Sequence, residues 1–168
     1  MSAGFVYNLP APRYLHKVLA NWSTSGILTF QDGSPENPVY FGTDFANSGT
    51  PNRPNRVLGQ SVTSPEGQRT AENWFNRSAF SDPAPYTFGN AGRNTLPTPG
   101  SAVVDLALHR RFPINEQAAF QLRVEGFNIL NHPNWGIPGE YPDFGPFFGK
   151  IFATGEPRRF QFAMRFDF

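Results

Sequence analysis

The chain is 168 residues long and nearly neutral, with 14 Lys plus Arg, 13 Asp plus Glu and a formal net charge of +1. At about 100–200 residues per domain, this length predicts at most one ordinary domain. The charge balance argues against nucleic acid as a partner, because nucleic-acid binding needs a basic patch. The absence of cysteine excludes disulfides, thiolate metal sites and cysteine nucleophiles.

Glycine, proline and aromatic residues dominate the composition. The sequence contains 16 Gly, 17 Pro and 18 Phe, and this combination favours short strands joined by elaborate loops over helices. No run approaches the about 20 apolar residues of a membrane-spanning helix. The N-terminus also lacks the basic and apolar regions of a signal peptide. These absences indicate either a cytoplasmic protein or a piece of a longer chain.

Two strands are predicted near the N-terminus, at about 3–9 and 22–32. In the second, apolar residues such as Trp22, Leu28 and Phe30 alternate with polar ones, which is the period of a strand. The connection between them, Pro10–Asn21, is longer than a minimal turn. A long loop follows at about 33–100.

Two motifs stand out in this long loop. The first is an aromatic group around Trp74 and Phe75, which we interpret as an anchor for the loop. The second has glycine and asparagine where positive φ angles are needed, and an arginine to tie the loop down; it consists of Phe88, Gly89, Asn90, Gly92, Arg93 and Asn94. Its glycines do not match a phosphate-binding fingerprint, so we assign it a structural role. We expect the loop aromatics to fold back on the sheet.

A hairpin is predicted from two alternating segments, 102–112 and 117–128, joined by a short turn at 113–116. A second long loop spans about 129–157. It begins with a polar and aromatic turn that contains Asn128, Asn131, His132 and Trp135. His132 has no second histidine, carboxylate pair or serine at a supporting position, so capping of the turn is favoured over metal binding or catalysis.

The last strand, 158–168, alternates without a break. Its apolar face consists of Phe160, Phe162, Met164, Phe166 and Phe168. Eleven residues at about 3.3 Å span ~36 Å, which a ~45° tilt reduces to ~25 Å, the height of the lipid-facing band of a barrel. A soluble sheet with its phenylalanines on a core is the alternative. Charged residues expected on the opposite face, as a cross-strand ladder or a solvated surface, are Asp105, Arg123, Glu125, Arg159 and Arg165.

The lengths of the connections also discriminate between these alternatives. Structureless loops as long as the two predicted here are rare in compact soluble domains. In an outer-membrane barrel, short periplasmic turns alternate with long extracellular loops. Counting back from a periplasmic C-terminus puts the turn at 113–116 on the periplasmic side and both long loops outside.

The ordered series of motifs resembles the C-terminal barrel region of Oar-like TonB-dependent outer-membrane receptors. The resemblance rests on segments 52–57, 73–80, 88–100, 105–108, 127–135 and 157–162. It implies an all-β fold, with about five antiparallel strands of a large transmembrane barrel in a Gram-negative outer membrane, and transport of an unknown ligand. It implies no enzymatic activity and no cofactor.

The resemblance also implies partners. These are outer-membrane lipid, the barrel-assembly machinery reading a signal that includes Phe168, the missing N-terminal strands and plug, and the TonB complex acting through the absent N-terminal region. We therefore expect the fragment alone to be inactive. Two rival hypotheses are a soluble carbohydrate-binding module that uses Trp74, Trp135 and other loop aromatics, and a hydrolase that uses His132.

Overall fold

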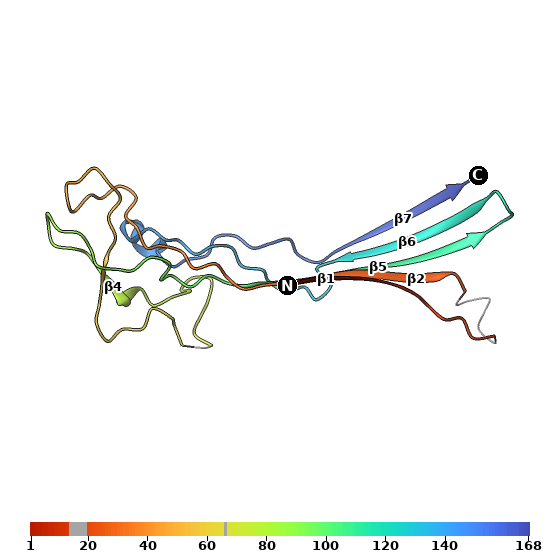
Figure 1. The fold of residues 1–168 in the computed structure, drawn as a ribbon, viewed down its shortest axis with the longest axis horizontal. Helices are drawn as coiled ribbons and strands as arrows, with labels where there is room; N and C mark the ends of the chain where they lie inside the picture. The colour runs from red at the N-terminus through yellow and green to blue at the C-terminus, as the bar shows by residue number, and fades with distance from the viewer. Residues whose placement is uncertain (14–19, 66) are drawn as a thin grey trace. The chain divides into compact units, whose positions relative to one another are not determined.

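A computed structural model describes residues 1–13, 20–65 and 67–168. Its main element is one antiparallel sheet (Figure 1). The order of strands in the sheet is β1 (Ser2–Asn8), β2 (Trp22–Gln31), β5 (Ser101–Pro113), β6 (Ala119–Phe127) and β7 (Arg159–Asp167). Each of these strands therefore pairs with the one before it and the one after it in this series. The prediction of about five antiparallel strands is confirmed, and the bounds differ from the expected ones by at most two residues.

The connections differ in length at the two ends of the sheet. β5 and β6 are joined by a tight turn, in which Oδ1 of Asn115 accepts the backbone N–H groups of Gln117 at 2.9 Å and Ala118 at 2.7 Å. The connection predicted at Pro10–Asn21 lies partly outside the described residues. At the opposite end of the sheet, the first long loop joins β2 to β5 and the second joins β6 to β7.

Antiparallel register sorts the strand residues onto two faces, because successive side chains point to opposite sides. Across the sheet, Thr24 lies opposite Leu108, Leu108 opposite Val124, and Val124 opposite Phe162. We call the face that contains these residues the apolar face: Ala3, Phe5, Tyr7, Trp22, Thr24, Gly26, Leu28, Phe30, Ala102, Val104, Leu106, Leu108, Arg110, Phe112, Phe120, Leu122, Val124, Gly126, Phe160, Phe162, Met164 and Phe166. The other side is the polar face.

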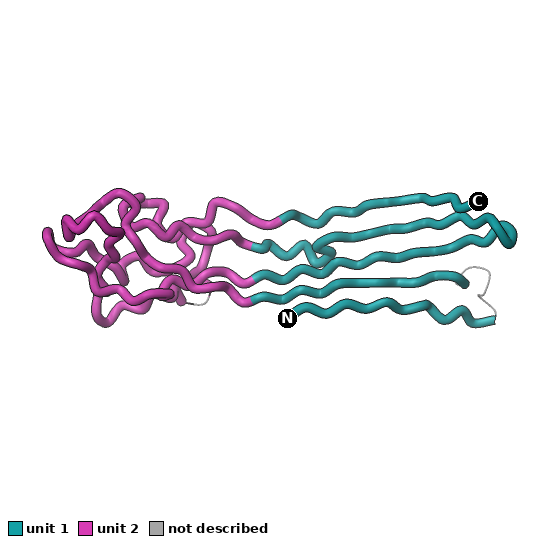
Figure 2. The backbone as a smooth tube through the Cα atoms, turned by 45° about the horizontal axis from the view of Figure 1, so that its top comes forward, with its two compact units in different colours: residues 1–31, 101–134, 156–168 teal, residues 32–100, 135–155 magenta. Residues whose placement is uncertain are grey.

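The two long loops form a compact unit of their own, residues 32–100 and 135–155, coloured magenta in Figure 2. It contains the short strands β3 (Asn55–Arg56) and β4 (Phe80–Ser81) and the 3₁₀ helices η2 (Arg77–Ala79) and η3 (Pro142–Phe147). These short elements do not show the sustained alternation from which the longer strands are predicted.

The core of the loop unit is formed by loop residues alone. Phe75, Leu96 and Phe148 are buried together, and the rings of Phe75 and Phe148 meet edge to face with centroids 4.9 Å apart. These rings pack on one another within the loop unit. Phe75, which the sequence analysis assigns to an anchor for the loop, is fully buried in this core.

No helix in the described part of the chain has the length and apolar character needed to cross a membrane.

Candidate functional site: the two faces of the sheet

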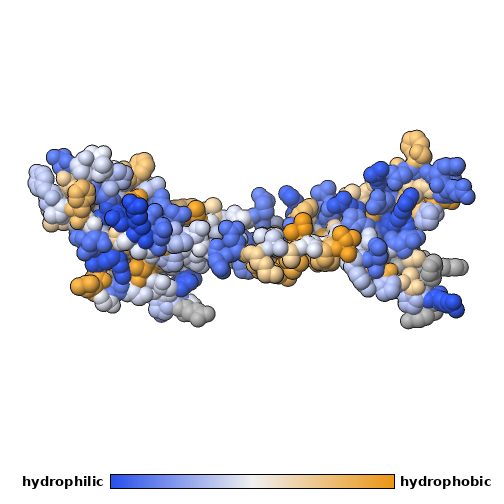
Figure 3. Space-filling model, in the orientation of Figure 1, coloured by the Kyte–Doolittle hydropathy of each residue, from blue (hydrophilic) through white to orange (hydrophobic). Residues whose placement is uncertain are grey.

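The apolar face exposes large hydrophobic side chains. Phe162 and Met164 are each 76 % exposed, and Phe160 and Phe166 are more than half exposed. Around the middle of Figure 3, hydrophobic side chains lie along the lower side of the strands and polar ones project from the upper side. Large contiguous apolar surfaces of this kind mark contact with lipid or with another protein. The register confirms that the phenylalanines of β7 share one face.

Glycines on the apolar face are covered by side chains of neighbouring strands. A Cβ atom at Gly26 would lie 2.6 Å from the ring of Phe5 and 2.7 Å from Leu106. At Gly126 it would lie 3.0 Å from the ring of Phe160. The rings therefore fill the positions where glycine has no side chain, and the hydrophobic surface continues across the strands.

The polar face carries the five charged residues predicted for it. Arg123 pairs with Glu125, and Nε of Arg165 lies 2.6 Å from Oδ1 of Asp167. Both pairs join residues two positions apart on the same strand. These two pairs therefore do not form the cross-strand ladder that was one of the alternatives from the sequence.

The remaining two charges have other contacts. Oδ1 of Asp105 accepts the backbone N–H of Asn128 at 2.8 Å, so this carboxylate fixes the end of β6. The guanidinium carbon of Arg159 lies 5.2 Å from the ring centroid of Phe127. Each predicted charge thus has a local partner, which lowers the free-energy cost of partial burial.

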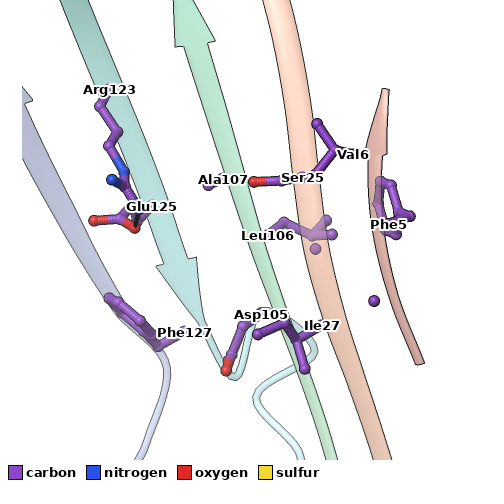
Figure 4. Close-up of a pocket in the computed structure, with 12 residues that line it drawn as sticks. Phe5, Val6, Ser25, Ile27, Asp105, Leu106, Ala107, Arg123, Glu125 and Phe127 are labelled. Atoms are coloured by element: carbon purple, nitrogen blue, oxygen red, sulfur yellow. Dashed lines mark hydrogen bonds and ion pairs between the residues drawn. The ribbon is translucent and has the colours of Figure 1, made fainter. Parts of the chain in front are cut away.

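An open hollow of about 490 Å³ lies over strands β1, β2, β5 and β6. Its lining includes Val6, Ser25, Ala107 and the Arg123–Glu125 pair. Figure 4 shows the guanidinium of Arg123 beside the carboxylate of Glu125 on β6, with Ser25 on β2 and strand β5 between them. The hollow therefore combines charged groups and the Ser25 hydroxyl with apolar side chains such as Ile27 and Phe127.

Asn128 organises the corner after β6. It is buried and has a φ of 46°, a backbone conformation that asparagine tolerates better than most residues. Its side-chain NH2 donates to the carbonyl groups of His132 at 3.1 Å and Glu156 at 3.0 Å. Its Oδ1 accepts the backbone N–H of His132 at 3.1 Å. One side chain therefore ties together both ends of the second long loop.

Asn131 and His132 complete this corner. Oδ1 of Asn131 accepts the backbone N–H of Arg158 at 3.1 Å, just before β7 begins. The ring Nδ1 of His132 lies 3.1 Å from Oδ1 of Asn134, which also accepts the backbone N–H of Ala102 at 2.7 Å. His132 thus lies in a network of turn contacts.

The glycine- and asparagine-rich motif docks on segment 53–56. Ala91 donates its backbone N–H to the carbonyl of Pro54 at 2.9 Å, and Asn94 donates its own to Oδ1 of Asn37 at 2.7 Å. A Cβ atom at Gly89 would lie only 1.8 Å from the carbonyl oxygen of Arg53. Glycine is required here because two backbones approach closely.

Other loop residues predicted from the sequence have different environments. Phe88, Gly92 and Arg93 are exposed, and no contact made by the Arg93 side chain is seen within the described residues. Trp74 and Trp135 are half-buried, and the guanidinium carbon of Arg69 lies 5.9 Å from the ring centroid of Trp74.

Asp143 joins the two long loops. Its carboxylate accepts the backbone N–H groups of Phe41 at 3.1 Å and Gly42 at 2.9 Å. Partial burial raises the pKa of Asp143, but the backbone hydrogen bonds from Gly42 and Phe41 outweigh this effect and hold the pKa below its usual range. The contact is therefore strongest when the carboxylate is ionised.

Three aromatic rings from both loops cluster beside this carboxylate. The ring centroid of Phe41 lies 5.3 Å from that of Tyr141 and 5.6 Å from that of Phe144. Phe41 is 71 % exposed and Phe144 is 45 % exposed. The alternation and motif spacing of the sequence do not identify this cluster, because Phe41 belongs to the first long loop and the other two rings belong to the second.

Arg110 is a second residue that sequence reasoning missed. It occupies a position of β5 that the alternation assigns to the apolar face, directly opposite Trp22 and Leu122. A charged residue that interrupts an otherwise apolar face is a signal that can be read from the sequence.

Within the described residues, no group of three or more His, Cys, Asp or Glu side chains is placed to hold a metal ion.

Comparison with known proteins agrees with this geometry. A family model described as an outer membrane beta barrel domain matches residues 1–161. No curated protein and no solved structure is a significant match. An antiparallel sheet with one apolar and one polar face, and with its long loops at one end, is the architecture of a barrel wall. The chain belongs to the outer membrane beta barrel domain family.

Proposed function

We propose that this outer-membrane barrel protein is the C-terminal part of an Oar-like, TonB-dependent receptor in a Gram-negative outer membrane, and that the whole receptor moves a ligand across that membrane. The ordered series of sequence motifs carries the proposal. Two of these motifs have defined structural roles, since Asn90 docks on Asn55 and Asn128 closes the second loop. The proposal assigns the chain no catalytic step.

The edges of the sheet support the need for further strands. Within the described residues, β1 and β7 each pair with one neighbour and leave their other edge open. In hydrocarbon, each unsatisfied backbone group costs several kcal/mol, and the smallest single-chain barrels have about eight strands. We therefore propose that N-terminal strands and a plug complete the barrel, and that the chain alone forms no closed pore.

The loop unit is the surface that we assign to ligand contact. The cluster formed by Phe41, Tyr141 and Phe144 offers exposed rings at the junction of both loops. The polar face, with its open hollow, suits the water-filled side of the wall. A soluble carbohydrate-binding module is disfavoured, because the family is one of outer-membrane barrels and because Trp74 and Trp135 are half-buried.

Coupling to TonB is tested on the whole polypeptide in its own outer membrane. An epitope inserted between Leu58 and Gly59 labels an exposed position, since Leu58 is 95 % exposed and nothing lies within 4 Å of a Cβ atom at Gly59. After crosslinking in living cells, the tagged protein is purified and probed for TonB. We expect a TonB adduct that is lost when the TonB-binding segment is deleted. A correctly assembled protein that never yields this adduct contradicts the proposal.

Recognition by the barrel-assembly machinery is tested separately. Phe168 is 97 % exposed and its ring stacks on that of Phe166, with centroids 5.9 Å apart. Deletion of Phe168 is expected to reduce the assembled fraction in the outer membrane at least several-fold, whereas Phe168→Trp, which keeps a terminal aromatic residue, assembles normally. Equal assembly of the deletion and the parent contradicts a signal that includes Phe168.

A further inference from the structure

An open hollow within the loop unit is lined by both an aromatic residue and a carboxylate. Its volume is about 270 Å³, and its lining includes Phe41, Thr43, Asp44 and Thr50. Sites that hold drug-sized ligands have volumes of about 300–1,000 Å³. This hollow therefore suits a smaller molecule.

The aromatic side of the hollow belongs to the cluster formed by Phe41, Tyr141 and Phe144. The ring centroids of Tyr141 and Phe144 lie 5.2 Å apart, and both rings contact that of Phe41. Because Phe41 is 71 % exposed, a ligand can reach its ring. The face of an aromatic ring carries negative charge density and attracts cations.

The carboxylate of Asp44 supplies a negative charge in the same hollow. Its oxygens accept the backbone N–H of Gly49 at 2.7 Å, the side-chain NH2 of Asn52 at 2.6 Å and the hydroxyl of Ser48 at 3.5 Å. The hydrogen bond from Gly49 is the main reason why the pKa of Asp44 lies below its usual range. These three donors are neutral, so they hold the carboxylate in place without balancing its charge.

Two further carboxylates bind residues that line the hollow. Asp143 accepts the backbone N–H of Phe41 at 3.1 Å, and Oδ1 of Asp82 accepts the hydroxyl of Tyr40 at 2.5 Å. Burial of Tyr40, its hydrogen bond to Asp82 and the charges of Asp82 and Asp143 together raise the pKa of the Tyr40 hydroxyl. Part of this shift reflects a negative electrostatic potential at this place.

Within the described residues, no ion pair balances these carboxylates. Segments 38–52, 82–87 and 139–145 contain four acidic residues and no Lys, Arg or His. Elsewhere in the loop unit, Lys150 pairs with Glu72, and Arg77 donates to backbone carbonyl groups. The hollow is therefore complementary in charge to a cationic ligand.

We propose that this hollow binds the quaternary ammonium group of a small soluble molecule, between the ring of Phe41 and the carboxylate of Asp44. Aromatic rings are the usual partners of quaternary ammonium ligands in proteins. Such a group donates no hydrogen bond, so it needs ring faces and negative charge but no free acceptor. A primary ammonium has three donors to satisfy, and the oxygens of Asp44 already accept three hydrogen bonds. The inference rests on the assignment of the loop unit to ligand contact and names the chemical class of the ligand.

The test measures binding of choline by isothermal titration calorimetry to the whole polypeptide, purified from the outer membrane in a neutral maltoside detergent. The comparison ligand is 3,3-dimethyl-1-butanol, which has the shape of choline but a carbon atom in place of the charged nitrogen. We expect choline to bind at least about tenfold more tightly than this neutral isostere, because only the cation is attracted to the ring and the carboxylate. Absence of choline binding, or equal affinity for the two ligands, overturns the proposal.

Matched variants test the two residues. Phe41→Leu keeps an apolar side chain but removes the ring face, and it is expected to lower the affinity for choline at least about fivefold. Phe88→Leu is the control at another exposed phenylalanine of the loop unit and should leave the affinity unchanged. Asp44→Asn keeps an oxygen for the N–H of Gly49 but removes the charge, so it should weaken binding of choline more than binding of the isostere. An assembled Phe41→Leu or Asp44→Asn variant with the parent's affinity for choline overturns the proposal.

The outcome is independent of coupling to TonB. Choline binding by a protein that yields no TonB adduct supports this site and contradicts only the TonB-dependent assignment. A TonB adduct without choline binding overturns this site alone.

Discussion

Asn55 and Asn90 each accept a backbone hydrogen bond from the segment that carries the other. Oδ1 of Asn55 accepts the N–H of Asn90 at 3.1 Å, and Oδ1 of Asn90 accepts the N–H of Arg56 at 2.8 Å. Two loop segments 35 positions apart are thereby joined side chain to backbone in both directions. This reciprocal contact explains why asparagine occurs at these points of the two motifs.

Replacing either asparagine with alanine is expected to destabilise the loop unit. Asn55→Ala and Asn90→Ala should each cost about 1–2 kcal/mol, because a backbone donor loses its acceptor. The double variant should cost less than the sum of the two, since both side chains serve one contact. Thermal unfolding followed by tryptophan fluorescence measures these changes, with Arg93→Ala as the control. Additive losses would contradict a shared contact.

Gly89→Ala is expected to be more harmful than either asparagine variant. The added methyl would lie 1.8 Å from the carbonyl oxygen of Arg53, so the motif must separate from segment 53–56. Overpacking of rigid backbone costs about 1–3 kcal/mol or more. Gly42→Ala is the control, because its Cβ atom would lie 3.9 Å from the nearest neighbour, on Asp143. The same fluorescence assay should show a large loss for the first and little for the second; similar losses would refute the close approach.

The contact between the loops through Asp143 is expected to weaken in acid. The folded-state pKa lies below the ordinary value of about 3.9, so its contribution to stability is present above that value and is lost as pH falls below about 4. Limited proteolysis of the loops at pH 7 and pH 3 measures the change. Asp143→Asn, which does not titrate, should show a smaller difference between the two pH values than the parent. An equal difference would show that other groups control the acid response.

Introducing an arginine on either side of β7 distinguishes its two faces. Phe162→Arg should cost about 2–4 kcal/mol in a bilayer, because we expect the apolar face that carries Phe162 to meet lipid. Gln161→Arg places the same side chain one position away on the polar face and should cost less than about 1 kcal/mol. Folding free energy in phospholipid vesicles, measured by urea titration of the whole polypeptide, gives the comparison. The opposite ranking would mean that the apolar face does not meet lipid.

The amino-acid sequence determined the strands and their faces. Apolar and polar residues alternate in segments such as 158–168, and this alternation predicts a strand. Because successive side chains of a strand point to opposite faces, the alternation also predicts which side chains share a face. The same reasoning correctly predicted that Arg123, Glu125 and Arg165 lie on the face of the sheet that does not carry Phe162. The prediction of positive φ angles in the asparagine-rich motifs is correct for Asn94, Asn128 and Asn131. It is wrong for Gly89, Asn90 and Gly92, whose φ angles are not positive.

The tertiary structure decided which distant segments meet. Asn55 with Asn90, Asp143 with Phe41, and Phe75 with Phe148 are contacts between loop residues far apart in the chain. Local propensity acts over a few residues, whereas these contacts depend on how two long loops close on each other, so no periodic pattern encodes them. The contact between Arg110 and Trp22 likewise depends on register, because only the pairing of β2 with β5 brings the ring to the guanidinium.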